Sequence, residues 1–276
     1  MKTSALVASL LLPLSVLAAP VLSITDPEGD DHGDGSLVYP ASGSAIQPGD
    51  LDLRLLTVSV DGDALRFEAT FRNTIRHPDT VIPSSGGNES LGQFARRGFY
   101  AFNIDIYIDT DRVPGSGNTV TLPGRRASIS PGHAWEKVVV LTPRPELMRR
   151  QLRDAVSEGA ASGGPNPLAT VDNAVFFATD VRVRGRTVSF TVPWSFLGSL
   201  NVADWSLTTL VTGAKLTIES DLSLGLARGS ALERLTLGAL QPGVGRPLDT
   251  WGSTGDRVPA TAVVDLLSPE IGRAHV

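Results

Sequence analysis

Alternation of apolar and polar residues with a period of two is the feature that most constrains this fold. It is clearest over residues 51–60 and 64–72, where Leu, Val, Phe and Ala alternate with charged or hydroxyl-bearing side chains. Successive side chains of a β-strand point to opposite faces, so this pattern predicts half-buried strands. The two runs are separated by Asp61-Gly62-Asp63, which is typical of a tight turn, and together they predict a β-hairpin. Within the first run the apolar positions change face after Leu55, which predicts a bulge.

The same pattern predicts more strands and little helix. Further strands are expected at residues 102–109, 136–141, 175–183, 187–192 and 205–211, with a second hairpin turn at Arg184-Gly185. Only residues 145–159 have helical spacing, and residues 193–198 are expected to add one helical turn. Residues 81–97 and 159–170 predict loops because Ser, Gly, Asn and Pro accumulate there without periodicity. We therefore predict an all-β fold, an antiparallel β-sandwich of the jelly-roll kind with one short helix.

Both ends of the chain are expected to lie outside the domain. Lys2, an apolar run over residues 5–17 and small residues before Pro20 predict a signal peptide at residues 1–19, with an uncleaved anchor as the alternative. The predicted location is secreted or periplasmic, and the absence of cysteine favours a bacterium. Residues 270–276 match what a sequencing-library adapter encodes in frame, so we expect an artefact there and a single domain at 20–269.

Composition and motifs argue against several functions. The formal net charge of −5 disfavours a nucleic-acid partner, because phosphate neutralisation requires clustered Lys and Arg. The lack of cysteine excludes thiol nucleophiles and zinc-cysteine sites. No Gly-x-Ser-x-Gly, His-Glu-x-x-His or phosphate-loop motif is present. We therefore predict a protein that is not an enzyme; the open alternative is a carboxylate pair for glycoside hydrolysis, whose spacing a sequence does not reveal.

The densest polar cluster follows the predicted signal peptide. It places five carboxylates within nine residues: Asp26, Glu28, Asp30, Asp31 and Asp34. Clustered carboxylates repel one another unless water or a cation neutralises them, and Ca²⁺ prefers several such oxygens from a flexible turn. The spacing does not fit an EF-hand loop, because Asp31 stands where that loop requires glycine. We predict a calcium site of another geometry; the alternative is a solvated acidic loop.

A second acidic group follows the strand predicted at residues 102–109. Asp109 and Asp111 stand before Val113-Pro114-Gly115, a turn sequence. Two carboxylates at this spacing are a candidate for half of a cation site. The alternative is a turn that ends the strand without a ligand.

Carbohydrate-binding surfaces stack flat aromatic rings on sugars and bond the hydroxyl groups through polar side chains. Trp194 and Trp205 flank a predicted turn between strands and are expected in the core. The candidate platforms are Trp135, beside His133, and Trp251, beside Asp249, because both stand in predicted loops. Core packing is the alternative for each of these rings.

The motifs together resemble a known family. The segment from Asp26 to Gly35, Tyr39-Pro40 and the segment from Pro48 to Leu53 are similar to the opening of the DOMON-like domain at the C-terminus of glucodextranases. The later segments follow in the order of that family: Ile106–Asp111, Pro123-Gly124-Arg125, Trp135-Glu136 and Val188–Gly198. The resemblance covers residues 24–269, and we expect this chain to depart from the usual pattern by lacking an attached hydrolase domain.

The resemblance implies a β-sandwich similar to type 9 carbohydrate-binding modules. It implies a non-catalytic protein that binds α-glucan or cell-envelope polysaccharide, at the cell surface by association, and it makes structural calcium at the opening acidic loop plausible. A structural envelope protein without a sugar pocket is the main alternative. Haem-binding DOMON proteins are a further one, for which Met148 would have to serve as an axial ligand although it stands in the predicted helix.

Overall fold

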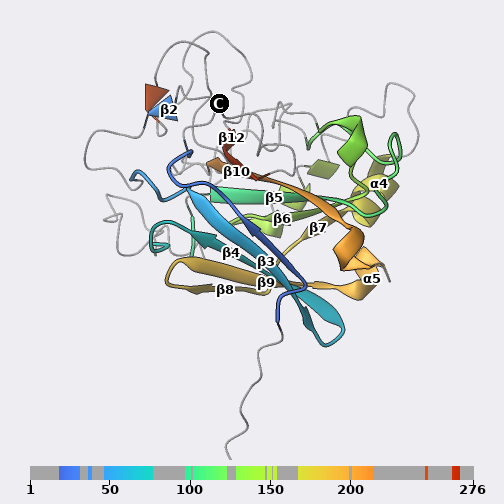
Figure 1. Ribbon diagram of the computed structural model, residues 1–276, viewed down its shortest axis with the longest axis horizontal. Helices are drawn as coiled ribbons and strands as arrows, with labels where there is room; N and C mark the ends of the chain where they lie inside the picture. Colours follow the sequence, from blue (N-terminus) through green and yellow to red (C-terminus); the bar gives the residue numbers. More distant parts are fainter. Residues whose placement is uncertain are drawn as a thin grey trace, which may run out of the picture.

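Two five-stranded sheets stack on each other in the computed structural model of this protein (Figure 1). The structure describes residues 19–31, 37–38, 47–76, 97–100, 102–122, 129–146, 148–150, 152–153, 167–198, 201–213, 246–247 and 263–267. The first sheet has the order β1 (Leu22–Thr25), β3 (Leu53–Asp61), β4 (Ala64–Phe71), β9 (Thr187–Pro193), β8 (Val181–Arg184). The second has the order β12 (Val263–Leu267), β10 (Ser206–Gly213), β5 (Phe102–Asp109), β6 (Lys137–Leu141), β7 (Val175–Phe177). The predicted all-β sandwich is confirmed.

The predicted first hairpin and its bulge are both present. β3 and β4 pair in antiparallel register from Asp61↔Ala64 onward, and the register shifts between Leu53 and Leu55. Gly62 occupies the turn with φ +62°, a left-handed conformation that favours glycine. The local sequence therefore determined both the hairpin and the position of its irregularity.

The single strand predicted over residues 175–183 is wrong, because the chain changes sheet within it. β7 pairs with β6 in the second sheet, and β8 pairs with β9 in the first. Ala178 is buried between them, while Thr179 and Asp180 are exposed at the crossing. β7 also runs parallel to β6, which is an exception to the otherwise antiparallel pairing within the two sheets. Short β2 (Leu37–Val38) and β11 (Arg246–Pro247) form a separate parallel pair.

Two hydrophobic clusters hold the layers together. The larger lies between the sheets and includes the inward-facing side chains of β3, β4, β5 and β9. Phe67 and Phe190 stack across neighbouring strands within it, with ring centroids 5.5 Å apart and planes inclined by 4°. The predicted alternation thus buries one face of the first sheet.

The smaller cluster covers the other face of the second sheet. Helical residues Met148 and Leu152 and α4 (Pro167–Ala174) pack there against Tyr107, Val138 and Val140. Every residue of β5 is consequently buried, including its polar positions. This explains why β5 lies at the centre of the molecule in Figure 1.

The helices are short. The predicted helix over 145–159 is confirmed at residues 145–146, 148–150 and 152–153, its other residues lying outside the described ones. α5 (Trp194–Leu197) is the helical turn expected over residues 193–198. The loop expected over residues 159–170 is wrong in its last part, because α4 begins at Pro167. A proline is tolerated at the first helical position, where the missing N–H would have no helical partner. Short 3₁₀ turns occur at Pro131–His133 and Val202–Asp204. Among the described residues, no helix is long and apolar enough to cross a membrane.

Replacing Phe67 with alanine is expected to destabilise the protein by about 3–5 kcal/mol, because it removes a stacked ring from the core between the sheets. Urea unfolding would measure the change through the midpoint at constant slope. Val60→Ala is the control, since Val60 is 44% exposed and its truncation should change stability by less than about 0.5 kcal/mol. Equal effects of both substitutions would contradict this description of the core.

Candidate functional site

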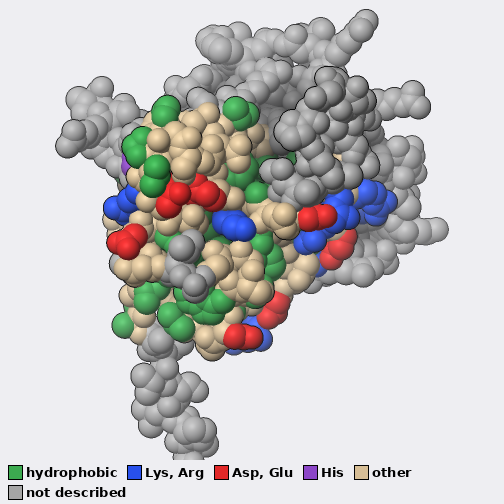
Figure 2. All heavy atoms as spheres, turned by 90° about the vertical axis from the view of Figure 1, so that its right-hand side faces the viewer, with side chains coloured by type: hydrophobic (Ala, Val, Ile, Leu, Met, Phe, Trp, Pro, Cys, Tyr) green, Lys and Arg blue, Asp and Glu red, His purple; other side chains and the backbone are tan. Residues whose placement is uncertain are grey.

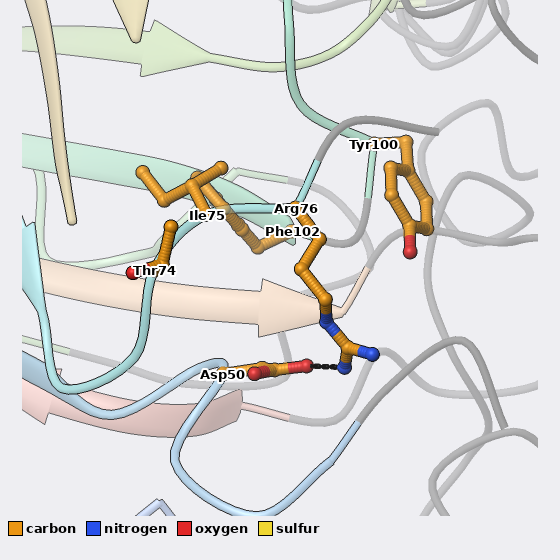
Figure 3. A pocket seen from close by; sticks show the side chains of 6 residues that line it. All are labelled: Asp50, Thr74, Ile75, Arg76, Tyr100 and Phe102. Atoms are coloured by element: carbon orange, nitrogen blue, oxygen red, sulfur yellow. Dashed lines mark hydrogen bonds and ion pairs between the residues drawn. The ribbon is translucent and has the colours of Figure 1, made fainter. Parts of the chain in front are cut away.

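A small hollow opens where the chain enters β3, leaves β4 and approaches β5. Its cavity volume is about 10 Å³, and it is lined by Asp50, Thr74, Ile75, Arg76, Tyr100 and Phe102. Figure 3 shows the Tyr100 hydroxyl and the Arg76 guanidinium pointing toward the same space, with Asp50 facing the guanidinium. A cavity of this size holds about one water molecule, so a ligand would meet the phenol, the cation and the carboxylate only from the protein surface.

Asp50 is held in place by donors from two segments. Its carboxylate accepts a hydrogen bond from the backbone N–H of Gln47 at 2.9 Å and one from Asn73 Nδ2 at 3.0 Å. Arg76 Nη2 donates to the same carboxylate and forms an ion pair with it. The side chains on the polar side of the hollow are therefore fixed in orientation before any ligand binds, which lowers the entropic cost of binding.

Tyr100 stays a neutral hydroxyl donor over the whole physiological range. Burial raises its pKa from 10.0 to about 12, the charge of Arg76 lowers it, and the charge of Asp50 raises it again. These effects confirm that all three groups share one environment. The phenol therefore remains protonated beside a cation and a carboxylate.

The opening acidic segment folds against the first sheet beside this hollow. Asp26 and Asp31 are buried, whereas Glu28 is exposed and pairs with Arg54 at 3.6 Å and with Arg72 at 3.4 Å. Asp31 Oδ2 accepts a hydrogen bond from Gly49 N at 3.0 Å, which ties the segment to the loop that carries Asp50. Asp26 and Asp31, two of the predicted ligands, are therefore covered by the protein rather than open to solvent. Asp34 lies outside the described residues.

Asp52 is a fully buried carboxylate that the alternating pattern placed at a polar, outward position. Its Oδ2 accepts a hydrogen bond from Gly29 N at 2.8 Å. Its Oδ1 has no hydrogen-bond partner among the described residues and lies 3.8 Å from Arg54 Nη1. Burial raises the pKa of Asp52, the hydrogen bond from Gly29 partly offsets this rise, and the nearby acidic residues add to it. This environment would accommodate one more positive charge.

Asp109, Asp111 and Glu136 bring one carboxylate oxygen each within 4.8 Å of one another. Asp109 is buried at the end of β5, Asp111 is exposed in the following turn, and Glu136 directly precedes β6. The pairing of β5 with β6 brings Glu136 to the turn. We call these residues the 109–136 acidic cluster.

Hydrogen bonds from the turn hold the cluster together. Glu136 Oε2 accepts from the backbone N and hydroxyl of Thr110 at 2.8 and 3.0 Å, and Ser116 Oγ contacts both Asp111 and Glu136 at 2.9–3.1 Å. Gly117 has φ +70°, and a Cβ there would meet Glu136 Oε1 at 2.2 Å. The hard oxygen donors of this cluster suit calcium better than a soft metal.

The expectation of an exposed ring at Trp135 is wrong. The ring is 6% exposed, packs edge-on against Tyr107 at 5.5 Å, and donates from Nε1 to Val120 O at 3.0 Å. It belongs to the smaller hydrophobic cluster, so core packing accounts for it. His133 is half-buried, with Nδ1 2.8 Å from Ser206 Oγ. Trp251 and Asp249 lie outside the described residues.

The remaining aromatic and sulfur candidates have structural roles. As predicted, Trp205 is buried in the core between the sheets. Trp194 is partly buried and packs against that core. Met148 is fully buried in the smaller cluster, which accounts for its presence in the helix.

The face that carries α4 and α5 is a mosaic. Figure 2 shows small groups of acidic side chains, several beside lysine or arginine, and scattered hydrophobic side chains on the described part of this face. Strong attraction of a single-charge polymer is not expected from such a surface.

Several site residues were not recognisable from the sequence. Glu136 was noted only as a member of a family motif, since nothing local links it to Asp109 or Asp111. The hollow joins Asp50, Arg76 and Tyr100, which are up to 50 positions apart in the chain. The signal that would have found Glu136 is the pairing of the strand at 102–109 with the strand after it.

The described residues thus form a two-layer β-sandwich with polar groups gathered at its loops and strand ends. A family profile describing the C-terminal, SLH-like binding module of glucodextranase matches residues 21–271, and the chain belongs to this family. No curated protein matches the sequence. The family is one of binding modules rather than catalytic domains, and it indicates a carbohydrate-binding role with a polysaccharide partner.

Tyr100 is expected to ionise near pH 12 in the folded protein, because burial keeps the phenol neutral. Its ionisation is read from the ultraviolet absorbance of tyrosinate, as the difference between the wild type and Tyr100→Phe. The raised pKa means that this group stabilises the folded state fully below pH 10, and that the contribution is lost as the pH rises toward 12. An ionisation near pH 10 in the folded protein would show that the hollow is open to water.

Proposed function

We propose that this chain is a secreted, non-catalytic module that binds polysaccharide, with α-glucan as the first candidate. The observation that carries the proposal is the family match over residues 21–271. Glucodextranase is named for action on a glucodextran, which supports an α-glucan over other glycans. The predicted signal peptide supports export to the periplasm or the cell surface.

We propose that a sugar unit binds across the mouth of the hollow beside Tyr100, since the hollow itself has room for about one water molecule. Arg76 and Asp50 offer a donor and an acceptor for neighbouring hydroxyl groups, and the Tyr100 phenol adds a second donor. Hydroxyl groups of a bound sugar would exchange water for these oriented partners. Affinity is expected to be modest, because one small hollow buries little apolar surface.

Wild-type protein should be retarded in native gels that contain dextran. Arg76→Gln should raise the dissociation constant for dextran about tenfold or more, because it removes a charged donor. Arg153→Gln is the matched control, because it removes the same charge from an exposed ion pair with Asp172. Equal retardation of both variants would contradict the proposed sugar site. Wild-type protein that binds cell-wall sacculi but neither dextran nor starch would favour the structural envelope protein instead.

We also propose that calcium stabilises the module. The 109–136 acidic cluster supports this through three converging carboxylate oxygens. The opening acidic segment and the neighbouring Asp52 support it through Asp30 Oδ1 and Asp52 Oδ1, which have no hydrogen-bond partner among the described residues. Like charges at such distances raise the energy of the folded state unless a cation lies among them. The role is structural, since the arrangement offers no reactive group.

Calcium at 100 times its dissociation constant should stabilise the chelated protein by about 2.7 kcal/mol, which corresponds to roughly 5–10 °C in the melting temperature. Glu136→Gln should abolish the shift if the 109–136 acidic cluster binds the ion, and Asp31→Asn should abolish it if the opening segment does. A scan in magnesium serves as the control for ionic strength. An unchanged melting temperature in millimolar calcium would remove this proposal.

A further inference from the structure

Three arginines line the edge of the first sheet, and none of them belongs to the proposed sugar site. Arg182 and Arg184 stand on β8, and Arg186 follows in the hairpin turn; all three side chains are exposed. Val181 and Val183 between them pack toward the core, so Arg182 and Arg184 share the outer face. Alternate residues of a strand lie about 7 Å apart, which sets the spacing of Arg182 and Arg184, while Arg186 lies beyond them in the turn. We call the three residues the arginine stripe.

Nothing acidic neutralises the arginine stripe among the described residues. No carboxylate of the described chain lies within ion-pair distance of these guanidinium groups, whereas Arg54, Arg66, Arg72, Arg76, Arg97 and Arg153 all have such a partner. On the same face, Glu68 is separated from Arg182 by the intervening Ser189, about 10 Å away across two strands. Asp180 is exposed just before β8. The stripe is thus a local excess of positive charge on a protein of formal net charge −5.

A row of hydroxyl groups runs beside the arginine stripe. Ser189 stands opposite Arg182, and Thr187 stands opposite Arg184 on β9. Thr187 Oγ1 lies 2.9 Å from Thr70 Oγ1 on β4, which continues the hydroxyl surface inward. These side chains are half-buried, so the described surface of β9 next to the stripe is polar.

The stripe lies at an open border of the sandwich. β8 is the last strand of the first sheet in the order β1-β3-β4-β9-β8, so its outer edge pairs with no described strand. Figure 1 shows β8 at the lower margin of the molecule, across the sandwich from β12. An extended chain can therefore approach both the guanidinium groups and the hydroxyl row.

We propose that the arginine stripe and the hydroxyl row of β9 bind an acidic polysaccharide that carries carboxylate groups, in addition to the neutral glycan of the hollow. Guanidinium groups match carboxylates through paired hydrogen bonds, and serine and threonine hydroxyls match sugar hydroxyls. The choice of a glycan over another polyanion rests on the proposed function. The surface is separate from the hollow, so the two activities are separable by substitution.

Affinity electrophoresis of the full chain in sodium polygalacturonate gels tests the proposal. The variant Arg182→Gln/Arg184→Gln/Arg186→Gln should raise the dissociation constant for polygalacturonate at least about tenfold. Each exposed arginine–carboxylate pair contributes modestly, but three such pairs are lost. Raising the salt concentration should weaken wild-type binding in the same direction. Retardation by dextran should be unchanged in this variant, which separates failure of this inference from failure of the proposed function.

The matched control is Arg149→Gln/Arg150→Gln/Arg153→Gln, which removes the same three charges from the helical segment on the other sheet. It should leave polygalacturonate binding intact, and the melting temperature of each variant confirms folding. Three outcomes would overturn the proposal: wild type that is not retarded, equal loss in both variants, or equal retardation by inorganic polyphosphate. The last would mean that the stripe recognises charge alone.

Discussion

Burial of β5 on both faces is the constraint on which the rest of this structure depends. One face packs into the core between the sheets, and the other is covered by α4 and the helical residues around Met148. A strand enclosed in this way cannot shift register without moving apolar groups into water. Its two ends are therefore fixed points. The hollow with Tyr100 adjoins its beginning, and the 109–136 acidic cluster adjoins its end.

The two acidic regions differ in how the repulsion between their carboxylates is offset. Around the opening segment, Arg54 and Arg72 lie close to Glu28 and Asp52, so protein cations offset part of the negative charge. In the 109–136 acidic cluster the carboxylates accept hydrogen bonds mainly from neutral backbone and hydroxyl donors. Neutral donors orient carboxylates but leave their charge in place, which is why the second cluster is the clearer candidate for a cation.

The polar surfaces of the sandwich are suited to recognition rather than to chemistry. The hollow presents a pre-formed carboxylate–guanidinium pair and a neutral phenol, while the arginine stripe presents cations that no described carboxylate pairs, beside hydroxyl groups. Both are shallow and lie on rigid strand ends or strand faces. Ligands bound there stay in contact with water, which fits a module that holds a polymer for others to process.

Local pattern determined β3, β4, β5, β6, β9 and β10, both hairpins, the bulge near Leu55 and the helical turn at Trp194, because each depends on residues only a few positions apart. It did not predict the edge strands β1 and β12. It also located Asp109 and Asp111 as a polar group at a strand end. The family resemblance, carried by motifs of the same local kind, anticipated the sandwich and the binding-module family. Tertiary structure alone decided that residues 175–183 serve two sheets, and that Asp52 and Trp135 are buried. Only the pairing of distant strands brings Glu136 to Asp109, or Tyr100 to Arg76 and Asp50, since side-chain periodicity specifies a face but not the neighbour that covers it.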